Sequence, residues 1–215
     1  MPRSQRRLGL SLRRRQTFYR VVLLAAIIPV SFVGAQTGQY RVLSMSNVIG
    51  APLATVPAVT GYPAHVPGTE FPDAAWVLRG TNSALRYTHR PETQALQQTQ
   101  PPLGRPECTR AALIPIRKAD AWWQLSQDER RAIFETRSQH IASTLRFLPA
   151  IARRLHQSRE LGEPFDFLTW FEYSEDDAPL FEELVALLRA TEEWQYVDRE
   201  VDIRLVKDGA ARDSR

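Results

Sequence analysis

Two residues in the second half of the chain, His140 and Arg153, carry side chains that can do chemistry. An imidazole can bind a metal ion, and a permanently charged guanidinium can bind an anion. On one straight helix their separation would turn the side chains about 220° apart and shift them by roughly 20 Å. Pro149 lies between them and disfavours helical geometry at Leu148. We therefore expect the two residues to lie on different elements and to approach one space from opposite sides.

Arg153 lies in a segment, 150–159, whose polarity alternates as in a β-strand. A guanidinium on an apolar, inward face needs an anion, because an unpaired buried charge is very costly. The pattern leaves two roles open: a structural ion pair with a carboxylate, or a cavity arginine that binds an anionic substrate. The two faces of the strand carry Ile151, Arg153 and Leu155, and Ala152, Arg154 and His156.

His140 lies at the margin of the apolar stripe of a predicted helix that runs from Ser126 to about Phe147. Ser126 and Glu129 have capping-box spacing at its start. A lone histidine in this position is more often a partly buried side chain than a metal ligand, so both roles stay open.

Two further pairs of residues are expected to bind a group of opposite charge. Lys118 and Trp122 are four residues apart and can present an ammonium and an indole N–H to one acidic group. Glu192 and Glu193 end a helix predicted from Pro179, where a negative charge opposes the macrodipole. We therefore expect a partner for one of these glutamates, unless both are exposed to solvent.

The elements that must position these residues have the order β-α-β-β-α-β, which is typical of a ferredoxin-like unit. The first half has weaker signals and is interpreted as a degenerate copy, with a loop-rich stretch at 47–73. We expect a leader at 1–26, a reduced N-terminal half at 27–100, a linker at 101–107, a C-terminal half at 108–207 and a tail at 208–215. The predicted strands and helices are 75–80, 85–88, 92–100 (helix), 111–116, 126–147 (helix), 150–159, 165–173, the helix from 179, and 197–206.

Composition excludes some classes of protein. The chain has 215 residues and a formal charge of +4, but seven arginines in the first twenty residues account for the excess, and without them the charge is −3. Nucleic acid is therefore not an expected partner. With Cys108 as the single cysteine, the chain has no intramolecular disulfide, no CxxC metal pair and no CxxCH haem attachment.

The first 35 residues fit two interpretations. A basic start, an apolar run at 21–30 and small residues before Ala35 resemble a signal peptide, and the run is too short to span a bilayer. Alternatively, Ile27 to Val33 form the first strand of the domain. Retention of this strand favours a cytoplasmic protein, which we slightly prefer, whereas cleavage of residues 1–35 as a signal peptide would make the protein periplasmic.

Several motifs together resemble the chlorite dismutase family, and most closely its short, dimeric branch. The resemblance is dense from about Arg79 to Val206 and weaker from Phe32 to Leu43. The motifs are the segments 112–118, 122–123, 128–131, 148–155, 162–172 and 190–194, together with His140.

This resemblance implies an α+β fold in which two ferredoxin-like halves form a dimeric α+β barrel, with antiparallel sheets and the helices outside. It also implies one haem b per subunit in the C-terminal half, and a homodimer. The residue roles implied are His140 as iron ligand, Glu193 as acceptor of its second ring N–H, Arg153 as catalytic residue, Lys118, Trp122 and Tyr87 as cofactor contacts, and Gln100, Thr169 and Phe171 in the distal pocket.

The activity implied is the decomposition of chlorite to chloride and dioxygen, with Arg153 retaining the hypochlorite-level fragment. Three alternatives remain: a haem peroxidase, a coprohaem decarboxylase-like enzyme, and a non-catalytic haem-binding module. The decarboxylases have a glutamine where this chain has Arg153, so the arginine favours chlorite chemistry.

Overall fold

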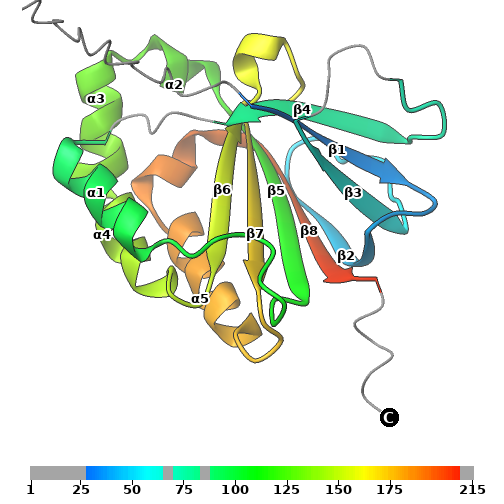
Figure 1. Ribbon diagram of the computed structural model, residues 1–215. Helices are drawn as coiled ribbons and strands as arrows, with labels where there is room; N and C mark the ends of the chain where they lie inside the picture. The colour runs from blue at the N-terminus through cyan, green and yellow to red at the C-terminus, as the bar shows by residue number, and fades with distance from the viewer. Residues whose placement is uncertain (1–27, 65–69, 83–87, 209–215) are drawn as a thin grey trace, which may run out of the picture.

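The computed structural model describes residues 28–64, 70–82 and 88–208. Eight antiparallel strands of these residues close a barrel in the order β1-β3-β2-β8-β5-β7-β6-β4 (Figure 1). In chain order the elements are β1 (Pro29–Ala35), β2 (Tyr40–Ile49), β3 (Ala58–Pro63), β4 (Trp76–Asn82), α1 (Arg90–Thr99), β5 (Arg110–Lys118), α2 (Asp120–Gln124), α3 (Gln127–Arg131), η1 (Ala132–Arg137), α4 (His140–Thr144), η2 (Leu145–Phe147), β6 (Ala152–Gln157), η3 (Arg159–Leu161), β7 (Phe167–Tyr173), α5 (Ala178–Arg189), η4 (Glu192–Tyr196) and β8 (Val197–Lys207).

The central strand β5 explains how the molecule forms two cores. Ala111 and Leu113 point into the barrel, where strands of both halves contribute side chains such as Phe32 and Ile203. Ala112 and Ile114 belong to a second core, formed on the outer face of the sheet together with α5. Because both faces are covered, β5 is an uninterrupted apolar run and not an alternating one.

The helices α1 to α5 lie beside the half of the barrel built from β5, β6, β7 and β8 (Figure 1). In this view none of α1 to α5 lies beside strands β1 to β4. The order of strands and helices from β5 to β8 is the predicted β-α-β-β-α-β unit. The predicted α+β fold, with antiparallel sheets and helices outside, is confirmed.

Two local predictions are wrong. The stretch 47–73, predicted as loop, contains the end of β2 and the whole of β3, which pairs with β1 from Ala58 to Pro63. Hydrogen bonding to the neighbouring strand stabilises β3, although its local sequence, rich in Pro and Gly, favours a loop. The helix predicted from Ser126 to Phe147 is broken into α3, η1, α4 and η2.

Strand β1 occupies residues that cleavage after Ala35 would remove. It pairs with β3 on one side and with β4 on the other, so its loss would open the barrel. Within the described residues, no helix is long and apolar enough to cross a membrane.

Candidate active site

A cavity of about 630 Å³ lies between the outer face of β5, β6 and β7 and the helices α1, η1, α4 and α5. Apolar side chains from the sheet, such as Ile114, Ile116 and Phe167, line its floor. His140 and Arg153 both reach this cavity, from α4 and β6. The prediction that they lie on different elements and approach one space is therefore confirmed.

The chain breaks its helix immediately before His140. Ser138 N–H donates to the carbonyl of Ile133, five residues back, which marks a π-helical turn, a feature often found at functional sites. Gln139 then has a φ of 50°, in the left-handed region, and His140 begins the new helix α4. A non-glycine residue rarely adopts this conformation, so tertiary contacts must hold it.

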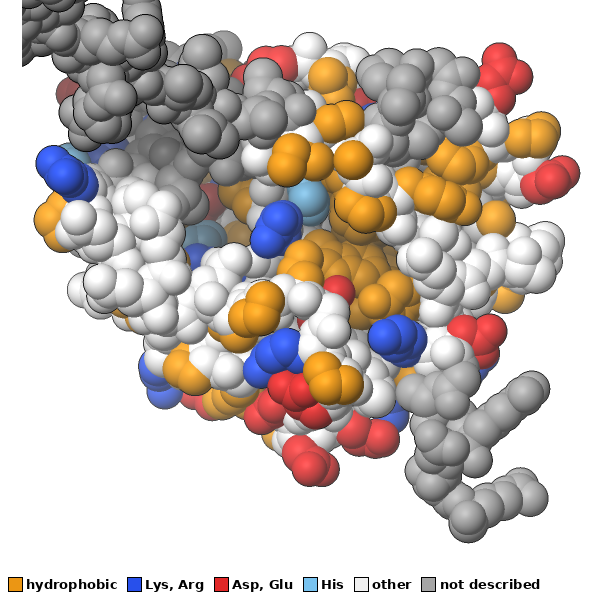
Figure 2. Space-filling model, in the orientation of Figure 1, with side chains coloured by type: hydrophobic (Ala, Val, Ile, Leu, Met, Phe, Trp, Pro, Cys, Tyr) orange, Lys and Arg blue, Asp and Glu red, His pale blue; other side chains and the backbone are white. Residues whose placement is uncertain are grey.

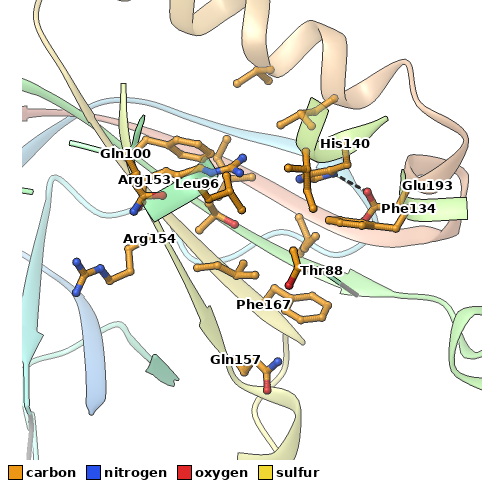
Figure 3. Close-up of a pocket in the computed structure, with 18 of the residues that line it drawn as sticks. Thr88, Leu96, Gln100, Phe134, His140, Arg153, Arg154, Gln157, Phe167 and Glu193 are labelled. Atoms are coloured by element: carbon orange, nitrogen blue, oxygen red, sulfur yellow. Dashed lines mark hydrogen bonds and ion pairs between the residues drawn. The ribbon is translucent and has the colours of Figure 1, made fainter. Parts of the chain in front are cut away.

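The imidazole of His140 is fixed by a ring contact and a hydrogen bond. Phe134 stacks on it, with ring centroids 4.4 Å apart. Its Nδ1 lies 2.7 Å from the carboxylate of Glu193 (Figure 3). Because this bond occupies Nδ1, Nε2 is left as the ring nitrogen available to a metal ion.

Glu193 lies in η4 and not at the end of α5, so the predicted conflict with the helix macrodipole does not arise. Its buried carboxylate binds the Lys118 ammonium at 2.8 Å as well as His140. Burial alone would raise the pKa of Glu193, but Lys118 and His140 outweigh it and lower the pKa to about 2. The carboxylate is therefore ionised at neutral pH and accepts the hydrogen of His140 Nδ1.

Lys118, which the resemblance implied as a cofactor contact, binds Glu193 in this structure. Its Nζ donates to the carboxylate and to the main-chain carbonyl of Glu193. It also lies over the indole rings of Trp122 and Trp194, at 4.8 and 5.6 Å from the ring centroids. Lys118 and Trp122 thus lie together, as predicted from their spacing, but only the ammonium binds the acidic group, Glu193, while Trp122 contributes the face of its ring.

Arg153 lies across the cavity from His140, beside Gln100 (Figure 3). Among the described residues it has no carboxylate within ion-pair distance, and its guanidinium makes one long hydrogen bond, 3.4 Å, to the hydroxyl of Thr144. Burial lowers the pKa of Arg153 to about 10, so the group keeps its charge at neutral pH. An arginine in this state can bind an anion that enters the cavity.

The remaining predicted site residues are distributed as follows. Gln100 donates to the main-chain carbonyl of Arg153 at 2.6 Å, so it holds the strand and not the guanidinium. Thr169 and Phe171 line the cavity. Tyr87 lies outside the described residues.

His156 illustrates the two faces of β6. It lies on the face opposite Arg153 and lines a second cavity, of about 340 Å³, between β1 and β7. Phe32 and Trp170 are part of the same lining. On the face seen in Figure 2, hydrophobic side chains gather over these strands, while charged side chains lie along the lower edge.

A model of the chlorite dismutase family matches residues 69–207, which is more than half of the chain and includes every element from β4 to β8. The chain belongs to the chlorite dismutase family. A curated chlorite dismutase from Ideonella dechloratans is 35% identical over 86 residues, which are 40% of this chain and 28% of that protein. The matched segment therefore spans less than a third of that relative.

Solved structures give a more complete match. The dimeric chlorite dismutase from Nitrobacter winogradskyi is 53% identical and has a TM-score of 0.77, with 83% of this chain and 99% of that chain covered. The resemblance to the short branch is thereby confirmed. The chlorite dismutase from Candidatus Nitrospira defluvii, solved with imidazole, is 17% identical, with a TM-score of 0.61 and coverages of 83% and 90%, and it shows the fold alone.

Three residues of the site in this family member were not predicted from its sequence. They are Phe134, which stacks on His140, Thr144, which contacts Arg153, and Glu135, which bonds the first turn of α4. Phe134 and Glu135 lie in η1, where a regular helix was expected, so the sequence pattern did not indicate that they contact His140 and α4. Thr144 lies one turn after His140, and this spacing was the available signal.

Proposed function

We propose that this protein is a haem b-dependent chlorite dismutase, which decomposes chlorite to chloride and dioxygen. One observation carries the proposal: an apolar cavity has a carboxylate-bound histidine on one wall and, on another, a half-buried arginine with no carboxylate partner among the described residues. The reaction needs no outside electron or proton, because one chlorite ion contains all the atoms of one chloride and one dioxygen.

The cavity fits haem held without covalent attachment. A haem iron takes four ligands from the porphyrin, so one imidazole suffices, and Nε2 of His140 is the nitrogen left available. The apolar side chains of Ile114, Ile116 and Phe167 offer a surface for a flat macrocycle. When bound, haem supplies the iron centre at which an oxygen atom is removed from chlorite and later returned.

Glu193 and Lys118 control the tautomer and the donor strength of the His140 imidazole. Glu193 fixes the tautomer of His140 and makes it a stronger electron donor, since its negative charge faces Nδ1–H. Lys118 keeps this carboxylate ionised in a buried place. A strongly donating imidazole stabilises higher oxidation states of a bound iron.

Arg153 binds the anions in this proposal. Its fixed charge attracts chlorite into the cavity and then retains the hypochlorite-level anion until dioxygen forms. A cation in an apolar, water-poor cavity is effective at such retention because low dielectric strengthens the attraction.

The alternatives within the superfamily are a haem peroxidase and a coprohaem decarboxylase, and the one outside catalysis is a haem-binding module. The charge of Arg153, which has no carboxylate partner in the part of the chain that the structure describes, favours an anionic substrate. A purely haem-binding module does not need a partly desolvated cation in its cavity, because such a charge costs stability. We also propose a homodimer, as in the relative from Nitrobacter winogradskyi.

An oxygen electrode tests the activity directly. The purified, haem-loaded protein is expected to release one dioxygen for each chlorite added, while guaiacol with peroxide and coprohaem with peroxide serve as comparison substrates. Release of no oxygen from chlorite by the haem-loaded protein rejects the proposal. Turnover of coprohaem to haem b in its place identifies the decarboxylase, and oxidation of guaiacol alone identifies a peroxidase.

A further inference from the structure

Helix α4, which carries His140, is too short to be stable by itself. It has five residues, less than two turns, and an isolated helix of this length does not persist in water. The first N–H groups of any helix have no acceptor within it. The direction of the His140 side chain therefore depends on the groups that bind this first turn.

Glu135 provides these acceptors. Its carboxylate reaches forward from η1 across the helix break and accepts the N–H groups of Ile141, at 2.7 Å, and Ala142, at 3.0 Å. These are the second and third residues of α4. The negative charge also complements the positive end of the helix dipole.

The break itself is tied to the same residue. Gln139, in the left-handed conformation, donates its N–H to the main-chain carbonyl of Glu135 at 2.9 Å. The hydroxyl of Ser138 accepts the N–H of Glu193 at 3.1 Å. One turn of chain thus holds both α4 and the carboxylate that faces His140.

We propose that Glu135 is a positioning residue that aims the His140 imidazole at Glu193 and into the cavity. The bond to Glu193 fixes one ring atom, but the direction of the ring also depends on where α4 starts. Glu135 fixes that start. The effect on a bound iron rests on the proposed function, while the effect on the His140–Glu193 bond does not.

Glu129 offers a matched control, because it is also a glutamate that caps a helix. Its carboxylate accepts the N–H of Ser126 at 2.7 Å, at the start of α3 and away from the cavity. If Glu135 only stabilised the fold, Glu135→Ala and Glu129→Ala would behave alike. A Glu135→Gln variant keeps one carbonyl acceptor without the charge and is expected to give intermediate values.

The first measurement uses the haem-free protein. Proton NMR follows the exchange with water of the His140 Nδ1 proton, which the bond to Glu193 protects. We expect exchange roughly tenfold faster in Glu135→Ala, as for loss of a helix cap, and unchanged in Glu129→Ala. Equal exchange in the parent protein and in Glu135→Ala overturns the proposal, whether or not haem binds.

The second measurement uses the haem-loaded protein. Resonance Raman spectra of the ferrous form are expected to show a shifted and broadened iron–histidine stretch in Glu135→Ala, with haem dissociation about tenfold faster. Glu129→Ala is expected to match the parent in both. An identical stretch and an identical dissociation rate in Glu135→Ala contradict the inference while leaving the proposed function intact.

Discussion

The ammonium of Lys118 lies 2.8 Å from the carboxylate of Glu193, and the two side chains are only 1% and 7% exposed. The pair joins β5 to η4 through residues far apart in the sequence. Because Glu193 also binds His140, one buried ion pair sets the charge next to the proposed iron ligand. The stability of the fold and the electronic state of the site therefore depend on the same contact.

Removing the cation of this pair should be costly. Lys118→Met leaves the Glu193 carboxylate buried without its main counter-charge, and we expect a loss of about 3–5 kcal/mol in the free energy of unfolding. Urea denaturation of the haem-free protein measures it. The exposed pair of Arg146 with Glu183 is the control, and Arg146→Met should cost at most about 1 kcal/mol. Equal losses in the two variants would show that burial of the Lys118 pair is unimportant.

Arg153→Met should separate stability from function. Replacing a half-buried charge that has no carboxylate partner among the described residues is expected to raise the free energy of unfolding by about 1–2 kcal/mol. The same variant should lose activity faster during turnover, because the oxidising anion escapes from the cavity. Urea denaturation and oxygen-release traces at rising chlorite concentration measure the two effects. An inactivation rate equal to that of the parent protein would show that Arg153 does not retain the oxidising anion.

His156 should make the protein sensitive to acid. Burial, helped by the nearby charge of Arg154, lowers the pKa of His156 from 6.5 to about 4. The unfolded chain therefore binds the extra proton first, and the contribution of this group is lost as the pH falls from about 6.5 to about 4. We expect a loss of about 2 kcal/mol between pH 7 and pH 5 that is absent in His156→Leu. Parallel urea titrations at both pH values check it, and equal pH dependence in the two proteins would contradict it.

His140→Ala should abolish haem ligation without unfolding the protein. His140 is the one imidazole, among the described residues, that lines the larger cavity. We expect the Soret band of the reconstituted protein to be lost or to shift to that of haem without a histidine ligand. Imidazole added to the buffer should restore the band by filling the space left in the wall. His156→Leu, in the second cavity, is the control and should keep the parent spectrum. A parent-like Soret band in His140→Ala would exclude His140 as the ligand.

The helix break before His140 could not be predicted from the sequence. Ser138 and Gln139 include neither glycine nor proline, so their local propensities predict a continuing helix. Gln139 donates its N–H to the carbonyl of Glu135, and the preceding residue, Ser138, accepts the N–H of Glu193. The contact with Glu193 joins segments far apart in the sequence, so the local pattern could not predict it. One of Glu192 and Glu193 was predicted to need a partner, but spacing could not identify the two partners of Glu193, which are Lys118, 75 residues away, and His140, 53 residues away.

The sequence by itself determined the strands of the second half, the α+β order and the two faces of β6, because each depends on alternation within a few residues. It also placed Arg153 and His156 on opposite faces, and motif similarity indicated the family. The tertiary structure alone decided where the helix breaks, which carboxylate faces His140, and that Arg153 lacks a carboxylate partner among the described residues. These features arise from burial and from contacts between distant segments, and such contacts exist only once the barrel has closed.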